Sequence, residues 1–70
     1  STMNIAELNF CVTMCIRHIT DYLEMMIPNV DLTYAHSMAK KFVLKASGMT
    51  SFWKNLAKLG LVDAKSDEMV

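Results

Sequence analysis

Three side chains of types that bind zinc lie close together in the first third of the sequence. Cys11, Cys15 and His18 follow one another at intervals of four and three residues, so on a helix they share one face. A fourth ligand would have to be His36 or come from a second chain, and the paired short Cys spacings of structural zinc sites are absent. Free Cys is among the most buried residue types. We therefore expect both Cys residues to pack in the core, and we assign no metal site and no cofactor.

No grouping of residues typical of catalysis is present. The 70-residue sequence contains no Gly-rich phosphate loop and no nucleophile motif, and its carboxylates are not clustered among apolar neighbours. A chain of this length also has little room for a substrate pocket. We expect a protein without enzymatic activity that acts by binding.

The charged residues are segregated along the chain, although the formal net charge is zero. Residues 1–31 carry one Arg against four acids, residues 32–62 carry five Lys and no acid, and residues 63–70 carry one Lys against three acids. The middle stretch is therefore wholly basic. Two interpretations remain open: the acidic first segment neutralises the basic stretch within the molecule, or the basic face is kept for an acidic partner.

Two breaks, Pro28-Asn29 and Ser47-Gly48, divide the chain into segments with helical apolar spacing. We expect a single all-α domain of three helices, at about 4–27, 31–46 and 50–60, followed by a frayed tail at 63–70. The first helix would be about 35 Å long, and two shorter helices cannot cover both sides of it.

Local signals mark the expected helix ends. Asp31 is a good N-cap residue for the second helix, and Thr50 or Ser51 can cap the third. Gly48 and Gly60 suit the left-handed position that ends a helix, with a fold-back contact after the second of them. The faces expected to point inward are Leu32, Ala35, Met38, Ala39, Phe42, Val43 and Ala46 on the second helix, and Phe52, Leu56 and Leu59 on the third.

Apolar residues cover the expected first helix on nearly every side. One row repeats at alternating intervals of three and four residues, as in a coiled-coil seam: Ile5, Leu8, Val12, Cys15, Ile19, Tyr22 and Met26. The polar stripe is narrow and runs through Asn9, Thr13, Arg17, Asp21 or Thr20, and Glu24. A helix that is apolar nearly all round is buried, and we expect a second copy to bury this row in a homodimer. The alternative is a monomeric bundle with some exposed apolar residues.

Residue types suited to a protein-binding surface occur in all three expected helices. Seven of the 70 residues are Met, whose flexible thioether suits adaptable surfaces. Trp, Tyr and Arg dominate binding hot spots. We expect a surface that binds an acidic protein partner, formed by Tyr34, Lys40, Lys41, Lys45, Trp53, Lys54 and Arg17. Each of the two aromatic residues could instead be a core-edge side chain.

Residues 38–62, MAKKFVLKASGMTSFWKNLAKLGLV, resemble a helix-turn-helix unit. The resemblance implies a transcription regulator that places the basic face of residues 36–58 on DNA. Ser51, Lys54, Asn55 and Lys58 would then face a groove, while Lys40, Lys41 and Lys45 approach phosphates. The match is imperfect, since Leu44 stands where a small residue is usual and Lys54 where the second helix should point inward.

The stretch MNIAELNFCVTMCIRHITDYLEMM is similar to small bacteriophage anti-activators of the type that silences quorum-sensing receptors. This resemblance implies a dimeric inhibitor that binds a host transcription regulator. No secretory signal pattern and no transmembrane stretch are visible, so we expect a cytoplasmic protein without a membrane partner. DNA binding through the basic face is the runner-up interpretation.

Overall fold

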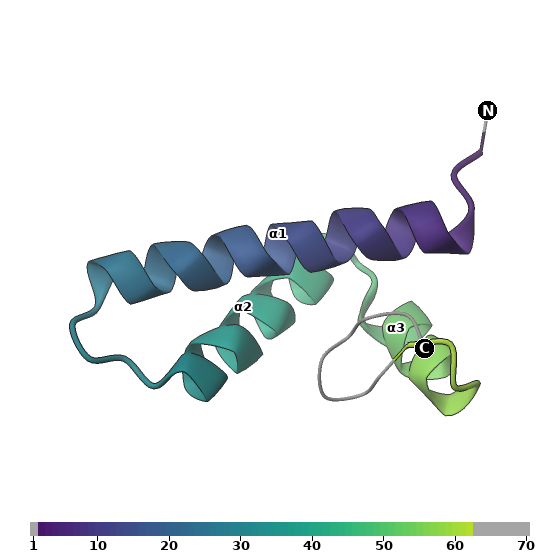
Figure 1. Ribbon diagram of the computed structural model, residues 1–70. Helices are drawn as coiled ribbons and strands as arrows, with labels where there is room; N and C mark the ends of the chain where they lie inside the picture. The colour runs from purple at the N-terminus through teal and green to yellow at the C-terminus, as the bar shows by residue number, and fades with distance from the viewer. Residues whose placement is uncertain (1, 63–70) are drawn as a thin grey trace.

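The computed structural model describes residues 2–62 of the chain. It contains three helices, α1 (Ile5–Met26), α2 (Leu32–Ala46) and α3 (Thr50–Lys58). In Figure 1, α1 runs the length of the molecule, α2 crosses beneath it, and α3 lies below its N-terminal half. The predicted all-α fold of three helices is confirmed, with each bound within two residues of its expected place. The predicted frayed tail, residues 63–70, lies outside the described residues.

Side-chain caps begin the first two helices but not the third. The Asn4 Oδ1 atom accepts a hydrogen bond of 2.8 Å from the backbone N–H of Glu7 at the start of α1. Asp31 caps α2 as predicted, because its Oδ2 atom accepts a 2.9 Å bond from the N–H of Tyr34. The expected cap at Thr50 or Ser51 is wrong. The N-cap of α3 is Met49, which makes no side-chain cap bond, because the short connection from α2 leaves Thr50 already helical.

The glycines that follow α2 and α3 both adopt the left-handed conformation that ends a helix, as predicted. Gly48 has φ 70°, and its N–H donates to the Lys45 carbonyl at 3.1 Å while the Met49 N–H donates to the Leu44 carbonyl at 2.8 Å. This pair of bonds is a Schellman motif. Gly60, at φ 74°, ends α3 with the equivalent pair of bonds. The motif after α2 turns the chain within three residues and thereby sets the angle between α2 and α3.

We predict that Gly48→Ala lowers the free energy of unfolding by about 1–2 kcal/mol. No heavy atom lies within 4 Å of the position of the added Cβ, so the cost comes from the φ of +70° and not from a clash. Urea denaturation followed by circular dichroism measures the loss. Gly48→Asn is the matched control, because Asn tolerates this conformation, and it should recover most of the stability. Equal stability of Gly48→Ala and the parent chain would contradict the prediction.

Two alanines of α2 allow α1 to approach closely. Ala35 and Ala39, one turn apart, are both 0% exposed, and the buried residues of α1 include the polar residues Asn9 and Thr20. These two polar residues were predicted on the solvent side, and that prediction is wrong. The Thr20 hydroxyl donates a 2.7 Å bond to the Ile16 carbonyl of its own helix, so its polar atom is satisfied and its methyl group can be buried.

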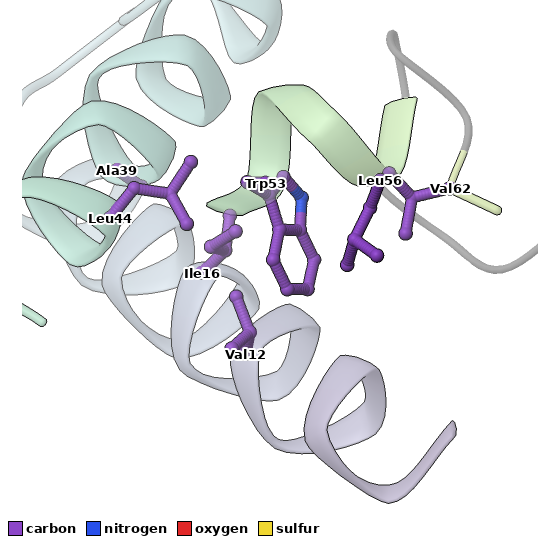
Figure 2. Close-up of a cluster of buried hydrophobic side chains, with 7 residues drawn as sticks. All are labelled: Val12, Ile16, Ala39, Leu44, Trp53, Leu56 and Val62. Atoms are coloured by element: carbon purple, nitrogen blue, oxygen red, sulfur yellow. The ribbon is translucent and has the colours of Figure 1, made fainter. Parts of the chain in front are cut away.

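The core lies where the three helices meet (Figure 2). Its buried members come from all three helices and the segment after α3: Val12, Ile16, Ala39, Leu44, Trp53, Leu56 and Val62. The Trp53 ring extends from α3 toward α1 and fills the centre of the cluster (Figure 2). Of the predicted inward face of α3, Leu56 is buried as expected at 4% exposure. Phe52 and Leu59 are exposed at 42% and 72%, and Trp53, at 3%, takes the inward position instead.

The inward face of α2 is also narrower than predicted. Ala35 and Ala39 are buried and Val43 is half-buried, as expected, but Leu32, Met38 and Phe42 are exposed, as is Ala46. Leu44, absent from the expected face, is buried because its side chain points toward α3 and joins the core. The two neighbouring helices therefore cover only part of the apolar surface of α2.

Candidate functional site

A groove of about 520 Å³ lies between α2 and α3. Its lining contains four lysines together with uncharged residues from both helices: Lys40, Lys41, Leu44 and Lys45 from α2, and Thr50, Trp53, Lys54 and Ala57 from α3. Leu44 and Trp53 are buried core residues, so the groove has an apolar floor fixed by the core. Lys41, Lys45 and Lys54 are exposed around it. We call this feature the basic groove.

The acidic residues of α1 do not pair with the rim of the basic groove. No ion pair joins Lys41, Lys45 or Lys54 to an acid within residues 2–62. Lys40 is half-buried and has an interaction of its own. One interpretation of the charge pattern was that acidic residues of the first segment neutralise the basic stretch. Within the described chain, no such contact is seen for the three exposed lysines.

Five of the seven predicted partner-binding residues lie together in the basic groove: Lys40, Lys41, Lys45, Trp53 and Lys54. The other two lie elsewhere. Tyr34 is 60% exposed near the start of α2 and does not line the groove. Arg17 lines a separate, more polar hollow of about 560 Å³ between α1 and α2, which it shares with Asp21, Glu24 and His36. The predicted set is therefore divided between three places on the surface.

Trp53 has a different environment from the predicted one. It is buried at 3% exposure, and it also has an interaction that involves its polar or ring atoms. It therefore contributes to the basic groove as part of its floor and not as a projecting side chain. Leu44, Thr50 and Ala57 also line the groove and were not predicted. Leu44 could have been predicted from the sequence, because it lies between Lys41 and Lys45 and, four residues after Lys40, on the same side of α2 as that lysine.

The three potential zinc ligands are all exposed. Cys11 and Cys15 are free thiols on the surface of α1, and His18 is exposed one turn further along. The prediction that the two Cys residues pack in the core is wrong, because α2 and α3 cover the opposite side of α1. Within residues 2–62, no group of three or more His, Cys, Asp or Glu side chains is arranged to hold a metal ion.

The predicted dimer row on α1 is divided between core and surface. Val12 is buried in the core of its own chain, and Leu8 and Ile19 pack half-buried against that core. The remaining members of the row are exposed: Ile5, Cys15, Tyr22 and Met26. The packing of α2 on α1 thus uses one edge of the row and leaves the other edge uncovered. Other large apolar side chains of α1, Phe10 at 65% and Met25 at 74%, are exposed as well.

The connection between α2 and α3 has the length of a helix-turn-helix turn. Ser47, Gly48 and Met49 separate the helices, and the exposed side of α3 carries Lys54 and Lys58. Lys54, which the resemblance would place inward, is exposed, and Trp53 takes the inward position instead.

Within residues 2–62, none of the helices combines the length and the apolar content that crossing a membrane requires. Comparison of the chain with known protein families, with curated proteins and with solved structures finds no match.

Proposed function

We propose that this chain is a cytoplasmic, dimeric, non-enzymatic inhibitor that binds a host transcription regulator through the basic groove. The observation that carries the proposal is an apolar floor bordered by three lysines without acidic partners in the described chain. Such a groove is complementary to a segment that carries carboxylates beside one or two large apolar side chains. The similarity to phage anti-activators supports the choice of a transcription regulator as the target.

The two parts of the groove have different roles in binding. The floor formed by Leu44, Trp53 and Ala57 removes an apolar anchor from water, which supplies most of the affinity. The lysine rim attracts acidic residues, and charge complementarity of this kind mainly raises the association rate and the specificity. An amphipathic helix with acidic residues beside an apolar stripe satisfies both parts at once. The bound segment would be unavailable to its own partners, and inhibition follows without chemistry.

We predict that Lys45→Glu and Lys54→Glu each weaken the binding of an acidic amphipathic peptide by about 3- to 10-fold. The probe is a labelled helical peptide with Glu flanking a Leu and Phe stripe, measured by fluorescence anisotropy at several salt concentrations. Lys58→Glu is the matched control, since Lys58 is an exposed lysine of α3 outside the groove. An effect of Lys58→Glu equal to that of Lys54→Glu would contradict binding in the groove.

DNA binding is the second candidate function. It is favoured by the exposed lysines of α3 after a tight glycine turn. In this case Lys54 and Lys58 would both approach DNA, so both charge reversals would weaken binding. Gel shifts on mixed duplexes at low and moderate salt test this, because several phosphate contacts make affinity fall steeply with salt. No binding at low salt would exclude the DNA interpretation.

A further inference from the structure

The chain carries a second group of acidic residues, which follows the described part. Of its seven acids, four precede residue 32, and three belong to residues 63–70, DAKSDEMV. None of the first four lines the basic groove: Glu7, Asp21, Glu24 and Asp31. Asp31 caps α2, and Asp21 and Glu24 line the separate hollow between α1 and α2. Residues 63–70, which we call the acidic segment, are therefore the remaining source of carboxylates in this sequence for the lysines of the groove.

The acidic segment has the composition to which the basic groove is complementary. Asp67 and Glu68 directly precede Met69 and Val70, so two carboxylates lie beside two apolar side chains in the sequence. The groove presents the matching arrangement, which is an apolar floor bordered by three exposed lysines. Because these lysines have no acidic partner within residues 2–62, their charges are available to the acids that follow. Charge attraction and apolar contact would therefore act on the same short segment.

The acidic segment can reach the groove from the point where the described residues end. Val62 is 2% exposed and packs beside Leu56 in the core cluster that also contains Trp53, the floor of the groove (Figure 2). Asp67 and Glu68 follow Val62 by five and six residues, and extended backbone of this length spans about 17–20 Å. A helix with its side chains is about 10–12 Å in diameter. The connection is therefore long enough to pass around α3 and enter the groove.

We propose that the acidic segment of the chain itself occupies the basic groove and competes there with the host protein. This inference rests on the proposed function, because it adds a regulation to the same groove. The carboxylates of Asp67 and Glu68 approach the exposed lysines of the rim, and Met69 contacts the apolar floor. In this arrangement the fold holds residues 63–70, contrary to the frayed tail that the sequence predicts.

The covalent connection makes even a weak contact effective. A short flexible linker gives an attached segment an effective concentration of about 1 mM at its site. A segment with an intrinsic Kd of about 0.1–0.5 mM would then weaken the binding of a competitor by about 3- to 10-fold. A partner that binds tightly still displaces the segment, whereas a weakly binding acidic sequence does not. The acidic segment thus raises the selectivity of the groove.

Zero-length crosslinking of the full chain tests the contact. A carbodiimide joins a lysine amine to a carboxylate that touches it, with loss of water, and mass spectrometry identifies the two residues. At low micromolar concentration we expect crosslinks within one chain between the acidic segment and the exposed lysines of the rim: Lys41, Lys45 and Lys54. Lys58 is the matched control, because it is exposed on α3 outside the groove. Crosslinks to Lys58 as abundant as those to the rim, or none to the rim, would overturn the proposal.

The same sample distinguishes a second copy as the source of the segment. Crosslinks to the rim that occur only in a covalent dimer would show that the segment of another chain enters the groove, and this would refute a contact within one chain. The double variant Asp67→Asn with Glu68→Gln should lose most of the rim crosslinks and keep the circular dichroism spectrum of the parent chain. Rim crosslinks that persist at the parent level in this variant would refute the roles of the two carboxylates.

Peptide affinity tests the competition. The double variant should bind the acidic amphipathic peptide about 3- to 10-fold more tightly than the parent chain, because the competing carboxylates are removed. Asp21→Asn with Glu24→Gln is the matched control, since it makes the same change in net charge at residues that line the separate hollow. Its affinity should stay within about 2-fold of the parent value. An equal gain in the two double variants would assign the effect to net charge and refute the competition.

The acidic segment and the proposed function can fail separately. Rim crosslinks in a chain that binds no acidic peptide, either as the parent or as the double variant, would refute the proposed function and leave the contact of the segment intact. Peptide binding that depends on the rim lysines, in a parent chain without rim crosslinks, would refute the contact of the segment and leave the proposed function intact.

Discussion

Trp53→Ala should remove a large part of the free energy of unfolding. Truncation of a buried Trp costs about 3–5 kcal/mol, and the whole stability of a domain of this size is about 4–10 kcal/mol. The indole ring is 3% exposed and lies between the Val12 and Ile16 side of α1 and Leu56 of α3 (Figure 2). Its loss removes the side chain that joins α3 to α1. Urea denaturation followed by far-ultraviolet circular dichroism measures the effect.

Phe52→Ala is the matched control for this substitution. Phe52 precedes Trp53 in the chain and is also aromatic, but it is 42% exposed, so its truncation should cost about 1 kcal/mol or less. Trp53→Phe should be intermediate, because it keeps an aromatic ring in the core. A urea midpoint for Trp53→Ala equal to that of the parent chain would return Trp53 to the surface, where the sequence pattern placed it.

Val12→Asp has the second largest expected effect, a loss of about 3–5 kcal/mol. Val12 is 6% exposed and belongs to the same core cluster as Trp53, so the new carboxylate would be buried without a partner. We expect a lowered urea midpoint and a lowered melting temperature, both followed by circular dichroism.

Comparison with Tyr22→Lys distinguishes the buried part of the predicted dimer row from its exposed part. Both residues belong to the predicted dimer row, but Val12 is in the core and Tyr22 is exposed. Val12→Asp should therefore destabilise the chain, whereas Tyr22→Lys should give a folded monomer. Ala6→Asp is the control for an added acid, because Ala6 is exposed in the first turn of α1, where a negative charge is favourable. A folded, monomeric Val12→Asp variant would show that Val12 faces a second copy and not its own core.

The helix limits could be predicted because their signals are local. Asp31 caps α2 through its own side chain, and Gly48 and Gly60 end α2 and α3 through conformations that other residues adopt at a cost. Each of these signals acts within a few residues of the helix end. The one wrong cap, at Thr50, was decided by the preceding turn, whose hydrogen bonds already fix Met49 as the N-cap.

The inward faces were harder to predict because they depend on contacts between distant residues. α1 is apolar on nearly every side, so spacing alone did not select the side that α2 covers. That side is selected by Ala35 and Ala39, which let α1 approach and bury even Thr20, a residue whose hydroxyl bonds to its own helix. In the same way, Trp53 and not Phe52 enters the core, because the direction of α3 is set by the Gly48 turn.

The candidate site was predicted in part for a similar reason. Lys40, Lys41 and Lys45 lie within two turns of α2, so their proximity follows from helix geometry. That Lys54 and Trp53 meet them depends on how α3 folds back, and Leu44 enters the groove only as a consequence of this packing. Arg17 and Tyr34 were grouped with the lysines by residue type alone, and the fold separates them. Binding of a host protein by this groove stays a prediction.

The chain contains a single Trp, and that residue is both a core side chain and the floor of the basic groove. Its emission spectrum therefore reports on the environment of one ring. Unfolding exposes this ring to water and shifts the emission to longer wavelength, whereas a ligand seated on the floor changes the emission of the folded chain without that exposure. The molecule thus carries its own optical probe, with which folding and groove occupancy can be followed in one sample without an added dye.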